Sequence, residues 1–255
     1  YYFLALRISG AKGNDYLSYV VSKSQTFKDF ITKSFDALLD FSVDDINFPH
    51  LYDERKYILS KMGEYTDELD CYCKQVYEKQ DKGIYYLTDN TRREKEMVVE
   101  LIAKYKYSME TLNNVLSVVY SDLSKYLKPY NYKKDYLNRY FSLYKYCKLT
   151  NCITDEMREM VQEQSVKRDY NVLLQPRSLY VDKLDKKAEE SVLYFIDAMG
   201  AEYMAFIQNK CYEAELDLYA DISRCDLPSI TSYNKEFVAE FDDAGCKVYS
   251  RKELD

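Results

Sequence analysis

An apolar stripe at helical spacing in the middle of the chain restricts the fold more than any other feature. It follows Thr91-Arg92-Arg93-Glu94, a capping-box pattern in which the threonine oxygen and the glutamate side chain satisfy backbone donors at a helix start. The apolar residues run over several turns: Met97, Val98, Leu101, Ile102, Tyr105, Met109, Leu112, Leu116 and Val119. Such a stripe faces a protein core, so we interpret it as packing rather than as a cofactor site.

Similar helical patterns precede and follow this stripe as far as about residue 164, and the pattern dissolves around Pro176. They cover residues 16–20, 26–39, 52–62, 67–79, 136–144 and 154–164. Pro129 ends the central run, because proline lacks the backbone donor that a helix interior needs. Two short apolar runs, residues 2–8 and 84–87, have strand character. We therefore expect residues 1–180 to form a mainly helical region with a leading strand.

The pattern changes after Tyr180. Residues 191–196 are a continuous apolar run of strand length, residues 203–207 return to a helical pattern, and residues 216–222 carry apolar side chains at every second position. A strand, a helix and a second strand in this order are typical of the start of an α/β sheet. The sequence predicts a domain boundary near Tyr180 and an α+β or α/β chain, in which residues 181–255 begin a sheet domain.

Asp197 and Thr231 follow these two predicted strands. Because ligands bind outside the carboxyl ends of the strands in open α/β sheets, we expect both side chains to face one crevice. A carboxylate can hold a divalent metal, and metal coordination activates a threonine hydroxyl as a nucleophile. Asn234, about one turn after Thr231, could donate a hydrogen bond to the charge that develops in the reaction. A plainer interpretation makes Asp197 and Thr231 helix caps and leaves Asn234 in solvent.

Two segments of this region resemble the PglZ family of bacterial phage-defence (BREX) systems, which belongs to the alkaline phosphatase superfamily. The segments are Phe195-Ile196-Asp197-Ala198-Met199-Gly200 and Leu227-Pro228-Ser229-Ile230-Thr231-Ser232-Tyr233-Asn234-Lys235-Glu236-Phe237. The resemblance implies that Asp197 is a metal ligand, that Thr231 is both the nucleophile and a metal ligand, and that Asn234 is catalytic. It also implies an alkaline-phosphatase-like α/β sheet for residues 181–255.

By this resemblance the parent protein is a metal-dependent phosphohydrolase, of phosphatase or phosphodiesterase type, in anti-phage defence. Its cofactors would be two divalent metal ions, zinc first, with manganese or magnesium as alternatives. Its substrate would be a phosphate ester, nucleotides and nucleic acid included, and other BREX proteins would be its partners. The superfamily draws further Asp and His ligands from beyond the nucleophile, so we expect this chain to be a fragment whose site closes outside it. The alternative is a non-catalytic scaffold that assembles a defence complex.

Composition narrows the remaining classes of function. A net charge of −7 argues against a general nucleic-acid-binding surface, because phosphate contacts need clustered Lys and Arg. No apolar run approaches the length of about 18 residues that a membrane span needs. Seven cysteines without a compact framework suit reduced thiols. We therefore expect a cytoplasmic protein that does not bind membranes.

Several clusters have both a functional and a plain interpretation. The Cys71/Cys73 and Cys147/Cys152 pairs could bind metal, but their spacing and helical context favour structural thiols. Interleaved Tyr and Lys in residues 130–134 could stack nucleic-acid bases, yet half-buried rings on helix faces explain the pattern more simply. The single histidine, which stands at position 50 next to a proline, is interpreted as a surface or capping residue rather than a catalytic base.

Overall fold

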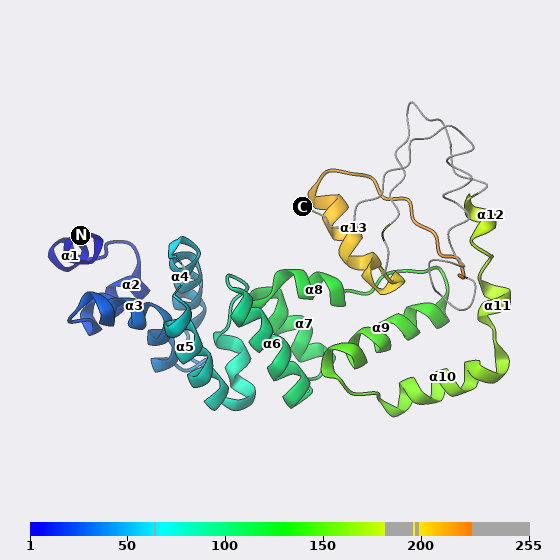
Figure 1. Cartoon of the computed structure of the whole chain (residues 1–255), viewed down its shortest axis with the longest axis horizontal. Coiled ribbons are helices and arrows are strands. Elements are labelled where there is room, and N and C mark those ends of the chain that lie inside the picture. The colour runs from blue at the N-terminus through cyan, green and yellow to red at the C-terminus, as the bar shows by residue number, and fades with distance from the viewer. Residues whose placement is uncertain (64, 182–195, 197–198, 226–255) are drawn as a thin grey trace. The chain divides into compact units, whose positions relative to one another are not determined.

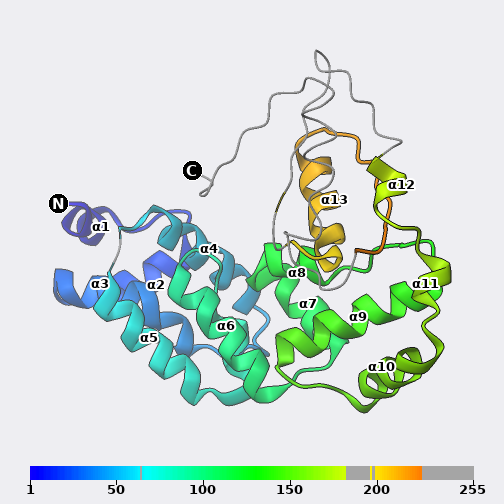
Figure 2. The same ribbon diagram turned by 45° about the vertical axis from the view of Figure 1, so that its right-hand side comes forward.

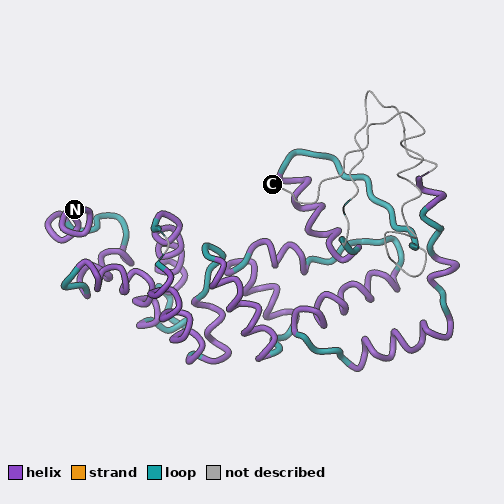
Figure 3. The backbone as a smooth tube through the Cα atoms, viewed as in Figure 1, coloured by secondary structure: helices purple, strands orange, loops and turns teal. Residues whose placement is uncertain are grey.

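Helices account for all the regular structure in the part of the chain that the computed structural model describes, which is residues 1–63, 65–181, 196 and 199–225. Figure 3 shows these helices in purple, with no strand within those ranges. The β-type pairing there is an isolated bridge between Pro176 and Arg224. The chain divides into two compact units: residues 1–128 with 145–153, and residues 129–144 with 154–255.

The first unit is an array of helices joined by short turns (Figure 1). In chain order its elements are α1 (Tyr2–Ser9), α2 (Asp15–Lys23), α3 (Phe27–Asp36), the 3₁₀ helix η1 (Ala37–Asp40), α4 (Phe48–Lys61), α5 (Thr66–Glu78), the 3₁₀ helix η2 (Gln80–Tyr86), α6 (Arg92–Tyr105), α7 (Met109–Val119), α8 (Ser121–Leu127) and the second half of α9 (Asp135–Thr150). Helix α2 packs against α3 and α4, and α7 packs against α8. Helices α5 and α6 lie side by side (Figure 2).

Polar side chains at the helix starts explain why many of these elements begin where they do. The Asn14 carboxamide oxygen accepts a hydrogen bond from the backbone N–H of Leu17 at 2.6 Å. Thr26 and Asp29 form a reciprocal capping box at the start of α3. The predicted capping box at Thr91 is confirmed for the threonine, whose hydroxyl accepts from the backbone N–H of Glu94 at 3.2 Å, but the Glu94 carboxylate accepts from the Thr91 hydroxyl at 3.1 Å instead of from its backbone N–H.

The predicted central stripe is confirmed as core, but it belongs to two helices. Lys106 adopts a left-handed conformation with φ of 51° and ends α6, and Ser108 then caps α7 by accepting from the backbone N–H of Thr111 at 3.1 Å. The stripe residues that are buried on both sides of this break are Met97, Val98, Leu101, Ile102, Leu112, Leu116 and Val119. The apolar spacing therefore continues from α6 into α7, although the chain changes direction between them at Lys106 to Ser108.

The predicted leading strand is wrong, because residues 2–8 lie in helix α1. Phe3 and Leu6, three positions apart, are buried on one helix face, whereas Leu4 and Ile8 are 58% and 88% exposed. A continuous apolar run fits a strand and a helix equally well, since it has no period of its own. Only the packing of one face against α2 and the aromatic rings of α3 decides between them.

The other two short strands predicted within the described ranges are wrong as well. Residues 84–86 belong to η2, which comes so close to α5 that a Cβ on Gly83 would lie 2.5 Å from the carbonyl oxygen of Val76. Residues 216–222 form no strand: Leu216 is 62% exposed, and Leu218, Ala220 and Ile222 are partly buried and alternate with exposed residues but pair with no strand among the described residues. The described ranges therefore contain no alkaline-phosphatase-like α/β sheet, which corrects the predicted fold class. Residues 191–195 and 226–237 lie outside those ranges.

Where the second unit is described, it contains the first part of α9, the helices α10 (Asp155–Lys167), α11 (Tyr170–Leu173), α12 (Ser178–Val181) and α13 (Met204–Glu213), and the 3₁₀ helix η3 (Ala201–Tyr203). The hydroxyl of Tyr132 donates to the carbonyl of Ala201 at 2.8 Å, and the Arg224 guanidinium reaches both oxygens of Asn171 at 3.0 and 3.1 Å. The boundary predicted near Tyr180 stays a prediction, since it borders residues that are not described. Of the helices described, none is long and apolar enough to cross a membrane.

Candidate docking groove

An open cavity of about 350 Å³ lies between the first half of α9 and helix α10, both within the second unit. We call it the α9–α10 groove, and Figure 1 shows α10 following α9 along the chain and lying below it in that view. Its lining consists of Asp135, Tyr136, Arg139, Glu156, Glu159, Met160 and Glu163. A cavity of this volume falls within the range of about 300–1,000 Å³ that is typical of ligand pockets.

Helical spacing brings the α10 side of the lining together. Glu156, Glu159, Met160 and Glu163 stand at positions i, i+3, i+4 and i+7, which share one face of a helix. Met160 is buried, whereas the three carboxylates are exposed. The groove therefore has an apolar floor and a charged rim on this side.

A guanidinium group already spans the groove. Arg139 on α9 donates from Nε and lies within ion-pair distance through Nη2, at 2.8 and 2.6 Å, to the same carboxylate oxygen of Glu156 on α10. Both side chains are about half exposed or more, at 62% and 47%, so the pair adds only about 0–1 kcal/mol to stability. The pair matters for its geometry, because it shows that a guanidinium fits between α9 and α10.

The remaining charges leave the groove negative. On α10, Glu163 forms an ion pair with Lys167, which lies one turn after it. Asp135 and Glu159 form no ion pair with any residue that the structure describes. Four carboxylates thus line the groove against one guanidinium, and two of the four are uncompensated within the described part of the chain.

Tyr136 forms the aromatic wall of the groove and is held by a ladder of stacked rings along α9. Its ring centroid lies 6.2 Å from that of Tyr140, and Tyr140 lies 5.9 Å from Tyr144, with interplanar angles of 18° and 14°. Burial is the main cause that raises the pKa of Tyr136, with smaller contributions from Tyr140 and Glu163. The phenol therefore stays neutral, and its ring presents a π-face rather than a charge.

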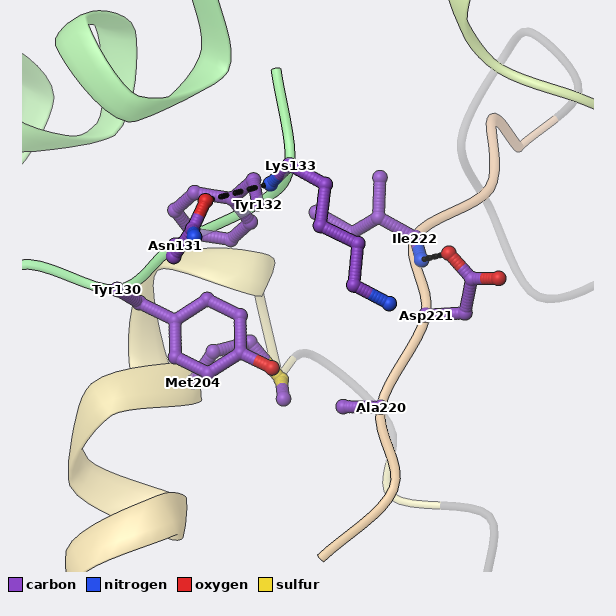
Figure 4. A pocket seen from close by; sticks show the side chains of 8 residues that line it. All are labelled: Tyr130, Asn131, Tyr132, Lys133, Met204, Ala220, Asp221 and Ile222. Atoms are coloured by element: carbon purple, nitrogen blue, oxygen red, sulfur yellow. Dashed lines mark hydrogen bonds between the residues drawn. The ribbon is translucent and has the colours of Figure 1, made fainter. Parts of the chain in front are cut away.

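A second recess in the same unit is too small to be a substrate site. It lies between residues 130–133, Met204 and residues 220–222, and Figure 4 shows the Lys133 side chain extending into it. Its cavity volume of about 10 Å³ is about enough for one water molecule. The Asn131 carboxamide accepts from the backbone N–H of Lys133 at 2.9 Å, so a turn holds the segment of interleaved Tyr and Lys. Tyr132 is buried, but it lies in the loop before α9 and not on a helix face as the plain interpretation expected.

The residues predicted to carry phosphohydrolase chemistry are not placed by this structure. Asp197, Thr231 and Asn234 lie outside the residues that it describes, so their roles stay predictions. Across the described positions, no group of three or more His, Cys, Asp or Glu residues is arranged to hold a metal ion. The two divalent metal ions implied by the resemblance stay a prediction.

The histidine and the cysteine pair that the sequence analysis considered lie among the described residues. His50 Nε2 lies 3.4 Å from Asp15 and 3.3 Å from Glu54, on an exposed surface. Cys73 is buried, and burial raises the pKa of its thiol to about 12, whereas Cys71 is exposed. Tyr136 lies in the helical pattern predicted at residues 136–144, but the groove itself was not predicted. The acidic spacing of Glu156, Glu159 and Glu163 was the available signal.

Comparisons with known proteins cover the first unit in part. A family model described as a domain of unknown function (DUF7863) matches residues 1–105, which end with the last residue of α6. No curated protein and no solved structure matches the chain. The α9–α10 groove lies outside the matched residues.

Proposed function

We propose that this chain is an assembly component that binds a partner protein through the α9–α10 groove. The observation that carries the proposal is the groove itself, a cavity of about 350 Å³ with an apolar floor, an aromatic wall and a charged rim. Protein interfaces combine an apolar centre rich in aromatic and Met side chains with a polar rim, and Tyr136 and Met160 supply such a centre. This proposal is the scaffold alternative predicted from the sequence, and it assigns the binding of the partner to the α9–α10 groove.

A photo-crosslinking amino acid placed at Tyr136 in the full chain tests this function in the cells that carry the gene. We expect one discrete adduct with another protein, and we expect Glu159→Lys to abolish it because that change reverses a charge on the rim. The same crosslinker at Tyr57, an exposed tyrosine of α4, is the matched control. Adducts that form equally at both positions, or that survive Glu159→Lys, would contradict docking in the groove.

The phosphohydrolase function is a second proposal, favoured by the PglZ-like segments around Asp197 and Thr231. In it the Thr231 oxygen would attack phosphorus as the bond to the ester's alcohol breaks, the alcohol would leave with a proton, and water would then hydrolyse the phosphothreonine to release phosphate. Asp197 would hold a divalent metal that favours the ionised hydroxyl, and Asn234 would stabilise the developing negative charge. Phosphate esters would be the substrates and zinc, manganese or magnesium the cofactors. The partners in either case would be other phage-defence proteins.

Hydrolysis of nitrophenyl phosphate mono- and diesters by the longest natural form of the protein tests this second proposal. We expect metal-dependent activity that Thr231→Ala removes, with Thr111→Ala in the first turn of α7 as the control. Activity that persists at the wild-type level in Thr231→Ala would exclude the threonine nucleophile. The two proposals are independent, because a scaffold can also carry an active site.

A further inference from the structure

We infer that the α9–α10 groove binds an arginine side chain of the partner, with the guanidinium over Tyr136 and between the carboxylates of Asp135 and Glu159. This inference rests on the proposed assembly function and names the chemistry of the docked segment. It excludes phosphate-rich partners, because four carboxylates line the groove against one guanidinium.

The groove already shows how it receives a guanidinium. Arg139 fills one end of it and directs Nε and Nη2 to a single oxygen of Glu156. Glu159 lies one helical turn further along α10, and no described residue compensates its charge. The same type of carboxylate is therefore repeated along the groove, first with a guanidinium and then without one.

Arginine fits this lining better than lysine. A guanidinium is planar, donates several hydrogen bonds in a fixed fork, and stacks on aromatic rings, whereas an ammonium is a strongly hydrated point charge. Tyr136 supplies the ring, and its stacking on Tyr140 holds that ring in one orientation. The apolar floor at Met160 receives the methylene groups of the incoming side chain. The guanidinium would therefore contact Tyr136 and the carboxylates, and the methylene groups would contact Met160.

The methyl group of Met160 gives a local reporter for the test. The full chain is labelled with carbon-13 at its methionine methyl groups, and the Met160 signal is assigned by its loss in Met160→Leu. A short Gly/Ser peptide that contains arginine is titrated to about 2 mM, a range that detects millimolar dissociation constants. Peptides with citrulline, the neutral isostere of arginine, and with lysine are titrated in parallel.

We expect a saturable shift of the Met160 signal with the arginine peptide, a weaker one with lysine and none with citrulline. Glu159→Gln and Tyr136→Leu should each weaken binding about three- to fivefold, as expected for one exposed ion pair or one cation–π contact. Glu78→Gln, at an exposed carboxylate of α5, should leave binding unchanged. Thermal unfolding by circular dichroism shows whether each variant is folded.

Equal shifts with arginine and citrulline, or no shift of Met160 in the titrated range, would overturn the inference. The crosslinking experiment then separates the two possible failures. If the adduct at Tyr136 persists and depends on Glu159, the groove docks a segment of different chemistry and only the arginine assignment falls. If that adduct is also absent, the assembly function falls with it.

Discussion

Arg55 Nη1 lies 3.6 Å from Oε1 of Glu94, and both side chains have no solvent exposure. The guanidinium also donates from Nε to the carbonyl of Phe35 at 3.0 Å and lies over the ring of Tyr72 at 4.3 Å. The carboxylate accepts the hydroxyl of Thr88 at 2.9 Å. This buried pair therefore ties α4 to α6 and to the last turn of α3 at the centre of the first unit.

Removing one member of this pair should destabilise the protein strongly. We expect Arg55→Met to lower the free energy of unfolding by about 3–5 kcal/mol, because it leaves the Glu94 carboxylate buried without a counter-charge. Urea unfolding measures the change. The double variant Arg55→Met with Glu94→Leu should recover much of the loss, since it removes both charges.

A surface pair provides the matched control for that prediction. Arg92 and Glu96 pair on α6 at 2.8 Å, but the Arg92 side chain is 93% exposed. Arg92→Met should therefore change the free energy of unfolding by about 0.5 kcal/mol or less. The prediction is wrong if Arg55→Met lowers the free energy of unfolding no more than Arg92→Met does. It is also wrong if the double variant is no more stable than Arg55→Met alone.

Local sequence signals predicted the helices of the first unit well and the strands poorly. The helices at residues 16–20, 26–39, 52–62 and 67–79 are confirmed as α2, α3 with η1, α4 and α5. Their apolar residues repeat at a helical period, and polar caps such as Thr26 stand at their starts. The runs at residues 2–8 and 84–87 have no such period, so sequence alone could not decide what they form.

The candidate groove was harder to predict because it depends on two helices at once. The helices that flank it were predicted at residues 136–144 and 154–164 and are confirmed as parts of α9 and α10. The cavity between them depends on how far apart they pack, and no residue pattern encodes that distance. Arg139 and Glu156 are seventeen positions apart, and nothing local in the sequence indicates that they meet.

A substitution at the end of α6 tests the left-handed residue that splits the central stripe. Lys106 has φ of 51°, a conformation that glycine adopts without the steric cost of a Cβ. We expect Lys106→Gly to raise the free energy of unfolding by about 1 kcal/mol, whereas Lys106→Ala should not raise it. Urea unfolding of the two variants checks this. A gain with alanine equal to that with glycine would show that the lysine side chain, rather than its backbone, is unfavourable here.

The buried amine of Lys145 should be a second stability determinant of the first unit. It is 1% exposed, and its ammonium donates to the carbonyls of Tyr126 at 3.0 Å and Lys128 at 2.6 Å, at the end of α8. Lys145→Met keeps most of the side-chain volume but leaves these carbonyls without their donor. We expect a loss of about 1–3 kcal/mol in the free energy of unfolding.

The exposed lysine Lys74 on α5 is the control for that substitution. Lys74→Met should stay within about 0.5 kcal/mol of the wild type, as expected for a surface position. Differential scanning calorimetry compares the two variants. Equal unfolding temperatures for the two would mean that the ammonium of Lys145 contributes nothing through the end of α8.

Buried tyrosines should make the protein unfold in alkali. Burial is the largest cause that raises the pKa values of Tyr16, Tyr52 and Tyr72 above the ordinary value of about 10. At a pH above that value the unfolded chain loses these protons while the folded chain keeps them. The folded state then binds more protons than the unfolded state, so stability falls as pH rises. Below about pH 10 the contribution of these phenols is fully present.

An ultraviolet titration of tyrosinate, followed together with circular dichroism, measures this effect. Exposed tyrosine rings should ionise first, without loss of helix. The buried rings should ionise only in a later step that coincides with unfolding. Tyr52→Phe removes one of these protons and the hydrogen bond to the carbonyl of Leu87, so it should make the later step less steep in pH. If all tyrosines ionise in one transition while the helices persist, solvent reaches these phenols in the folded protein, and the buried cluster around Arg55 is more open than its packing indicates.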